Sequence, residues 1–144
     1  YSSAASDVYK RQEFARSKAE QRAGKGQSLE LYTADSTGLD AFLKARSADV
    51  IVADLPYGVQ HGAKVGANLS RSPLELLRKA LPAWGRVLAR GGAVALAYNR
   101  HTTPVDDVRA ILVKHGLEIV GEDMNVRHRV DASIDRDIAL ARKA

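Results

Sequence analysis

The hydrophobic residues of the chain fall into short runs separated by polar segments. Residues 29–33 alternate apolar and polar side chains and predict a short strand, whereas the continuous apolar run 50–53 predicts a strand buried on both faces. Residues 93–98 form a second continuous run of this kind. Two later runs, 117–120 and 138–141, also predict strands.

The best-defined helix is predicted between the two continuous runs. Its apolar residues recur at helical spacing, and they are Leu74, Leu77, Leu81, Trp84 and Leu88. We expect Ser72 to be its N-cap and Glu75 to complete a capping box, with Pro73 at the first helical position. Pro82 is expected to kink this helix, and the glycine pair 91–92 to end it.

Weaker helical patterns occupy residues 13–22, 37–44 and 103–115. The third has acidic residues in its first turn and is expected to end at Gly116. Strands and helices thus alternate, which is typical of α/β proteins with a mainly parallel sheet. No internal repeat marks a second domain.

Composition narrows the possible classes of protein. The 144 residues suffice for one modest core and include no cysteine, which excludes disulfides and thiolate zinc sites. The apolar runs fall short of the roughly 20 residues that span a bilayer, and the cytoplasm is the expected compartment. A net charge of +5 gives mild support to a polyanionic partner, with a basic domain that binds no nucleic acid as the alternative. The histidines lack ligand spacing, so we expect no metal site.

The first residues of the chain match an artificial sequence. The segment SSAASDVYKRQ, residues 2–12, is identical to the in-frame translation of a transposase adapter used to prepare sequencing libraries. We therefore expect residues 1–12 not to be native and leave them out of the fold prediction. On this interpretation, residues 13–144 are the carboxyl-terminal part of one domain whose start is missing. The alternative is a genuine flexible tail rich in Ser and Ala.

Polar residues follow three of the predicted strands. They are Asp35 with Ser36, then Asp54 with residues 55–58, and finally Asn99 with residues 100 and 101. In open parallel sheets, ligands bind beyond the carboxyl ends of the strands, so these are the candidate site residues. Asp35 has a second interpretation as the cap of the helix that follows it, and we interpret residues 99–101 mainly as a segment that leads into a helix.

The sequence DLPYG, residues 54–58, carries the most chemical information. Asp54 can accept a hydrogen bond from an amino group, and Pro56 stiffens the backbone so that nearby carbonyl groups point in fixed directions. Tyr57 offers a flat face for a nucleobase, and Gly58 begins a glycine-spaced loop that can close over a ligand. These residues predict a pocket for a planar amine. The alternative is a strand-to-loop turn with a packed tyrosine.

The DLPYG sequence resembles the Asp/Asn-x-Pro-Tyr/Phe motif of S-adenosylmethionine-dependent amino methyltransferases. Residues 87–96, VLARGGAVAL, are similar to the helix-glycine-strand passage of that superfamily, and the strand-end Asp35 also fits it. Because Leu55 replaces the commoner second proline, the motif is most similar to the THUMP-associated group that methylates guanine N2 in tRNA. The resemblance covers residues 29–143.

This resemblance implies a Rossmann-like methyltransferase fold with the strand order 3-2-1-4-5-7-6. Its sheet is mainly parallel with an antiparallel last strand, and we expect the first two strands to be missing here. Residues 13–144 would then be the carboxyl-terminal part of one methyltransferase domain.

The resemblance also implies a role for each residue of the motif. Asp54 and the backbone carbonyl of Leu55 would hydrogen-bond the amino group that receives the methyl group, in a geometry fixed by Pro56. Tyr57 and Gly58 would hold the base, which must leave its stack to reach them. The implied partner is RNA, in particular tRNA, with neither a membrane nor a metal involved.

S-adenosylmethionine is the implied cofactor. Asp35, with Ser36 beside it, would contact the adenine amino group of the cofactor, and Asp54 would also contact the cofactor. The glycine-rich cofactor loop of the family belongs before residue 29, where the sequence has none. We therefore expect a poorly soluble chain that binds no cofactor by itself.

Two alternative functions remain from the sequence. The first is an adenine-N6 methyltransferase acting on DNA or RNA, which would use the same pocket for another amine. The second is a non-catalytic α/β module that binds nucleic acid through its basic helix surface.

Overall fold

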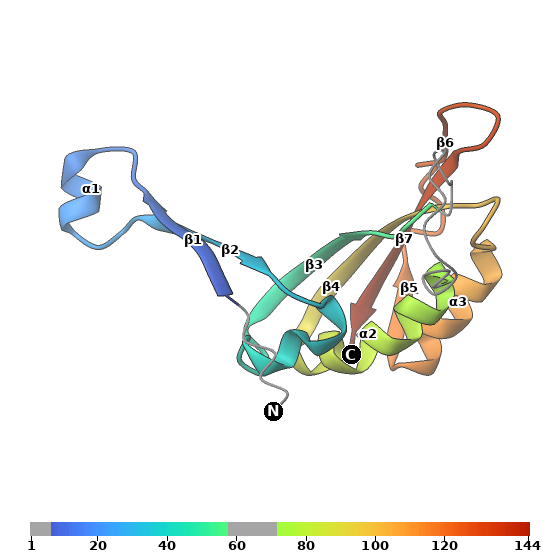
Figure 1. The fold of residues 1–144 in the computed structure, drawn as a ribbon, viewed down its shortest axis with the longest axis horizontal. Coiled ribbons are helices and arrows are strands. Elements are labelled where there is room, and N and C mark those ends of the chain that lie inside the picture. Colours follow the sequence, from blue (N-terminus) through green and yellow to red (C-terminus); the bar gives the residue numbers. More distant parts are fainter. Residues whose placement is uncertain (1–6, 58–71) are drawn as a thin grey trace. The chain divides into compact units, whose positions relative to one another are not determined.

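The computed structural model describes residues 7–57 and 72–144, so the predictions for Gly58 and the loop after it lie outside the described residues. The chain divides into two compact units, Tyr1–Ser36 and Thr37–Ala144, which we call the amino-terminal unit and the sheet unit (Figure 1). Each unit has a sheet of its own.

The amino-terminal unit is a hairpin with a short helix between its strands. β1 (Asp7–Phe14) pairs antiparallel with β2 (Gln27–Thr33), and α1 (Lys18–Arg22) lies between them in the chain. The strand predicted over residues 29–33 is confirmed as part of β2. β1 was not predicted, because residues 7–12 belong to the segment that we left out of the fold prediction.

The prediction of a helix over residues 13–22 is wrong for the first residues of that range. Glu13 lies in β1, where it pairs with Ser28 of β2. Helix α1 begins only after Ser17, whose side-chain hydroxyl accepts a hydrogen bond of 3.2 Å from the amide of Glu20. Pairing with β2 keeps the chain extended up to Phe14, and the Ser17 cap then starts the helix.

The sheet unit alternates strands and helices, as predicted. A 3₁₀ helix (Ser36–Ala41) starts at the last residue of the amino-terminal unit and continues into the sheet unit. The elements that follow are, in chain order, β3 (Ala48–Asp54), α2 (Pro73–Val87), β4 (Leu88–Asn99), α3 (Val105–Lys114), β5 (Leu117–Val120), β6 (His128–Arg129) and β7 (Asp135–Lys143). The helix predicted over residues 37–44 is therefore a shorter 3₁₀ helix. β6 was not predicted, because two residues carry no hydrophobic periodicity.

The strand order in this sheet is β3-β4-β7-β5, and β6 pairs with β7. β3 and β4 are parallel, whereas β7 runs antiparallel to both β4 and β5. β6 is also antiparallel to β7, so β3, β4, β5 and β6 share one direction and the last strand opposes them. This mixed sheet confirms the predicted antiparallel last strand and reproduces the 4-5-7-6 part of the expected order.

Helices α2 and α3 pack on one face of this sheet (Figure 1). Alternate residues of β4 contribute to the core on that face, namely Val94, Leu96 and Tyr98, each at most 1% exposed. Buried helix residues complete the core: Leu77, Leu81, Trp84, Val108, Ile111 and Leu112. The predicted helical spacing thus identifies the correct buried faces of both helices.

The two ends of α2 differ from the prediction. The side chain of Ser72 makes no capping hydrogen bond to the amides of α2, all of which are described. Glu75 pairs with Lys79 at 2.7 Å instead of completing a capping box. The helix continues through Pro82 and ends at Val87, before the glycine pair that was expected to end it.

A distant side chain explains the early end of α2. Lys143 Nζ donates hydrogen bonds to the carbonyls of Gly85 (2.6 Å) and Leu88 (2.8 Å), so the helix end needs no glycine cap. The glycine pair instead lies within β4. A Cβ atom on Gly92 would lie 2.9 Å from the carbonyl oxygen of Asp49. Glycine at this position therefore permits β3 and β4 to approach each other.

The opposite face of the sheet is apolar, and no described element of the sheet unit covers it. Val50 and Val52 of β3 are 59% and 78% exposed, and they lie opposite Ala93 and Ala95 of β4. Ile138 of β7 is 37% exposed on the same face. The prediction that residues 50–53 are buried on both faces is therefore wrong, because helices cover only one face.

We expect the uncovered face to drive self-association, because large exposed apolar patches mark association sites. Val52→Lys places a charge in the middle of this face and should reduce association. Val113→Lys is the matched control, because Val113 is 58% exposed on α3 and outside the face. Sedimentation velocity at several protein concentrations measures the effect, and equal association of the two variants would contradict the expectation.

Candidate functional site

The candidate site begins at the carboxyl end of β3. Asp54 is the last residue of this strand and lies opposite Ala97 of β4. The amide of Leu55 donates a hydrogen bond of 2.9 Å to the carbonyl of Ala97, and the Leu55 side chain is buried in the core. Asp54 and Pro56 are exposed on either side of it. Leu55 therefore anchors the motif while the Asp54 carboxylate remains accessible.

Tyr57 is held by residues from two other strand ends. Its carbonyl accepts hydrogen bonds from Asn99 Nδ2 (3.3 Å) and Thr102 Oγ1 (3.2 Å), which lie at and just after the end of β4. The guanidinium of Arg136, at the start of β7, lies over the Tyr57 ring at 5.3 Å from its centre. Three strand ends therefore meet at Tyr57.

The Asn99 side chain is 1% exposed and uses its full hydrogen-bonding capacity. Its Nδ2 donates to the carbonyls of Tyr57 (3.3 Å) and Ser133 (2.9 Å). Its Oδ1 accepts from the amides of His101 (3.2 Å) and Asp135 (3.1 Å). One side-chain amide thus joins the exit of β3, the end of β4 and the turn before β7.

Asn99 was among the candidate residues, but its contact with Tyr57 was not predicted, and Arg136 was not predicted as a site residue. From the sequence we interpreted residues 99–101 as a segment that leads into a helix, and α3 does follow at Val105, but the Asn99 side chain also holds Tyr57. The available signal was its position at the carboxyl end of a buried strand, which proves to be the neighbour of β3.

The Tyr57 hydroxyl is buried and has no hydrogen-bond partner within residues 7–57 and 72–144. Burial raises the pKa of this hydroxyl, and the negative charge of the nearby Asp54 carboxylate raises it further. Tyr57 therefore remains a neutral phenol at physiological pH.

An ion pair between the buried Asp135 carboxylate and the half-exposed Arg127 supports the start of β7. Asp135 is 4% exposed, and its carboxylate accepts hydrogen bonds from Arg127 Nη2 (2.7 Å) and Arg127 Nε (2.9 and 3.1 Å). This guanidinium lowers the pKa of the Asp135 carboxyl below its usual range. Because the Asp135 amide also donates to Asn99, the ion pair fixes the turn that Asn99 contacts.

Two of the three residues predicted to contact the cofactor, Asp35 and Ser36, belong to the amino-terminal unit. They follow β2 directly, at the strand end where the sequence predicts them. Asp54 to Tyr57 belong to the sheet unit. The structure therefore brings together Asp54, Tyr57, Asn99 and Arg136, while a shared site with Asp35 and Ser36 stays a prediction.

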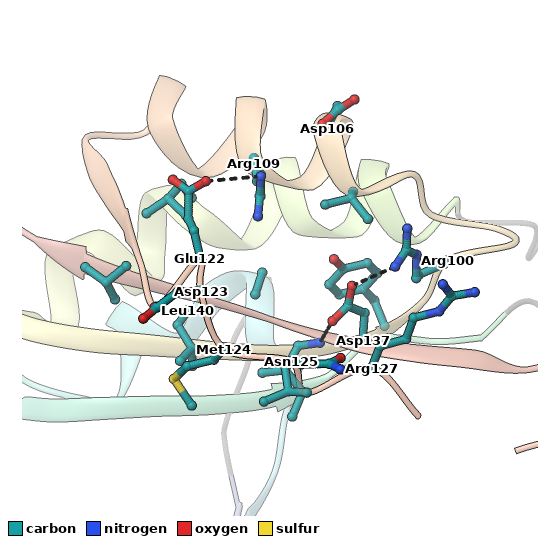
Figure 2. A pocket seen from close by; sticks show the side chains of 18 residues that line it. Arg100, Asp106, Arg109, Glu122, Asp123, Met124, Asn125, Arg127, Asp137 and Leu140 are labelled. Carbon is teal, nitrogen blue, oxygen red and sulfur yellow. Dashed lines mark hydrogen bonds and ion pairs between the residues drawn. The ribbon is translucent and has the colours of Figure 1, made fainter. Parts of the chain in front are cut away.

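A cavity of about 590 Å³ lies between α3, β7 and the loop after β5 (Figure 2). Two ion pairs lie along it, Arg100 with Asp137 and Arg109 with Glu122, each at 3.4 Å. Burial, with a smaller contribution from the charge of Asp137, raises the pKa of Tyr98 in its wall to about 12. No pattern in the sequence indicated this cavity, because its walls come from separate elements that converge only in the fold.

The polar groups around Tyr57 are a carboxylate, an amide, a phenol and a guanidinium. Within the described part of the chain, no three His, Asp or Glu side chains gather closely enough to hold a metal ion. The described helices are also too short or too polar to cross a membrane.

Comparison with known protein families identifies the family of the chain. A family model described as "RMKL-like, methyltransferase domain" matches residues 3–118. The chain belongs to this methyltransferase family. The match includes the DLPYG motif and both continuous apolar runs, and it confirms the resemblance to S-adenosylmethionine-dependent methyltransferases. It also includes residues 3–12 of the adapter-like segment.

Solved structures show the fold of the methyltransferase. A DNA modification methylase candidate from Thermus thermophilus is 16% identical with a TM-score of 0.51, over 77% of this chain and 52% of that chain. TrmN from Thermus thermophilus is 20% identical with a TM-score of 0.51, over 88% of this chain and 32% of that chain. The chain thus spans about half of the first structure and about a third of the second. No curated protein matches it at a significant level.

These structural likenesses confirm the predicted α/β, Rossmann-like fold class. At such low identity they show the fold alone. The reaction of the methyltransferase therefore depends on the residues of its own site.

We expect Asn99→Ala to destabilise the sheet unit by about 2 to 4 kcal/mol, because it leaves several buried backbone groups without a partner. Urea unfolding followed by circular dichroism measures this loss. Asn125→Ala is the control, since Asn125 is an exposed amide in the loop after β5 and should change stability by less than about 0.5 kcal/mol. Equal unfolding midpoints for the two variants would contradict the role assigned to Asn99.

The Asp135 ion pair predicts a pH dependence of stability. Its folded-state pKa is lowered, so its contribution is fully present above the unfolded pKa of about 4 and is lost as the pH falls through the folded value. The stability difference between the wild type and Asp135→Asn should therefore shrink as the pH falls below about 4. Urea unfolding across this range tests the expectation, with the exposed Asp123→Asn as control. A difference that stays constant with pH would contradict it.

Proposed function

We propose that this protein transfers a methyl group from S-adenosylmethionine to the exocyclic N2 amino group of guanine in tRNA. The observation that carries the proposal is the Asp54 to Tyr57 motif, which Leu55 and Asn99 hold at the carboxyl end of β3. Membership of the methyltransferase family supports the reaction class. TrmN, a tRNA methyltransferase of similar fold, supports RNA as the substrate.

The residues of the motif fit the chemistry of amino methylation. The exocyclic nitrogen of guanine is a poor nucleophile while its lone pair is delocalised into the ring. The exposed Asp54 carboxylate and the Leu55 carbonyl can accept hydrogen bonds from this amino group and favour its pyramidal form. Tyr57 provides a stacking surface that offsets part of the cost of removing the base from its stack.

S-adenosylmethionine supplies the methyl group as a sulfonium when it is bound. The donor set fits such a cationic cofactor, because Asp54 places an exposed carboxylate at the sheet edge where cofactors of open α/β sheets bind. Asp35 and Ser36 would hold its adenine from the end of β2. Which RNA the protein recognises then depends on surfaces outside this motif.

Adenine N6 in DNA or RNA is the alternative acceptor, and likeness to the DNA modification methylase candidate favours DNA as the substrate of such a reaction. The same pocket would hold either amine, because Asp54 accepts a hydrogen bond from an amino group of any base. Identification of the methylated nucleoside separates the two functions.

We expect Asp54→Ala to lower methyl transfer by about 100-fold or more, because the variant removes a side-chain acceptor of the amino protons. The assay uses the complete gene product, unmodified tRNA and mass spectrometry of the digested nucleosides. Asp106→Ala is the control, since Asp106 is an exposed acid in the first turn of α3 and lies outside the motif.

The product decides among the functions. N2-methylguanosine supports the proposal, whereas N6-methyladenosine supports the alternative acceptor. Absence of any methyl transfer by the wild type, together with retained RNA binding by Asp54→Ala, would favour the non-catalytic binding module.

A further inference from the structure

Two side chains from one cross-strand pair contact different parts of Tyr57, its backbone carbonyl and its ring. Asn99 and Arg136 are directly opposed in the antiparallel pairing of β4 with β7, so both side chains leave the sheet on the same face. Asn99 holds the carbonyl of Tyr57, and Arg136 lies over the ring of the same residue. The backbone and the aromatic ring are therefore positioned by a single register pair.

Arg136 is available for the ring because its acidic neighbours have other partners. Asp135 is paired with Arg127, and Asp137 with Arg100. The Nε atom of Arg136 is buried without a hydrogen-bond partner among the described residues. A guanidinium without another partner is attracted by the negative face of an aromatic ring, and partial burial strengthens this cation–π attraction.

We propose that Asn99 and Arg136 form a clamp that presets Tyr57, so that a planar nucleobase stacks on the ring face opposite the Arg136 guanidinium. The inference rests on the proposed function, in which Tyr57 receives the target base. A preset ring avoids the loss of side-chain freedom that would otherwise oppose binding. Arg136 and Asn99 are positioning residues in this scheme, because they act through Tyr57.

The clamp is observable without any substrate. A guanidinium over a tyrosine face experiences the ring current, so the Arg136 Nε–H proton should resonate upfield in NMR spectra of the full chain. Tyr57→Leu should remove this shift. Arg142→Gln is the matched control and should leave the Arg136 signal shifted. Arg142 lies on the same strand and the same face as Arg136, but it contacts Gly91 instead of Tyr57. An unshifted Arg136 signal in the wild type would overturn the clamp.

The affinity of the protein for guanosine and adenosine monophosphates tests whether a base stacks on the preset Tyr57 ring. Arg136→Gln should weaken both nucleotides by about threefold to tenfold, and Arg136→Lys should restore most of the loss because it keeps the cation. Asn99→Ser, which shortens the side chain so that it no longer reaches the Tyr57 carbonyl, should weaken both nucleotides similarly. Full affinity in Arg136→Gln, or no rescue by lysine, would overturn the proposal.

Further readouts separate this inference from the proposed function. Contacts between base protons and the Arg136 side chain in nuclear Overhauser spectra would place the base on the wrong face and overturn the stacking arrangement. A shifted Arg136 signal without any nucleotide binding would support the clamp but contradict Tyr57 as the base site. Nucleotide binding that follows the clamp variants, with no N2-methylguanosine formed, would support the clamp and refute the guanine reaction.

Discussion

The four hydrogen bonds of the Asn99 side chain fix the geometry on which the site depends. They join the carbonyl of Tyr57 to the turn before β7, through an amide that is almost completely buried. A buried amide is stable only when its donors and acceptors are paired, so each segment is held in one position relative to the others. The motif after β3 is thus positioned by strands that come much later in the chain.

The packing of the sheet unit explains how such a site is supported. α2 and α3 bury one face of the sheet, and Leu55 anchors the motif in that core. The other face carries exposed valines and small alanines. The motif is therefore anchored in the well-packed side of the sheet, while the opposite side is apolar and open within this unit.

Local patterns predicted most elements correctly and their ends less well. The second continuous apolar run, the helix over α3 and the DLPYG strand end follow from nearby residues alone. The predictions that failed have distant causes. Lys143 donates hydrogen bonds to the carbonyls at the end of α2, and pairing with β2 keeps residues 13 and 14 extended. The helices also cover only one face of β3. A periodic pattern shows which residues are apolar, but it does not show what will cover them.

The family and the reactive motif follow from the amino-acid order alone, because Asp54, Pro56 and Tyr57 are neighbours in the chain and keep their spacing in any fold. Folding is what brings Asn99 and Arg136 to Tyr57 and opens a cavity beside β7. These contacts depend on the antiparallel register of β7 with β4, and that register is set by long-range pairing that no local pattern encodes.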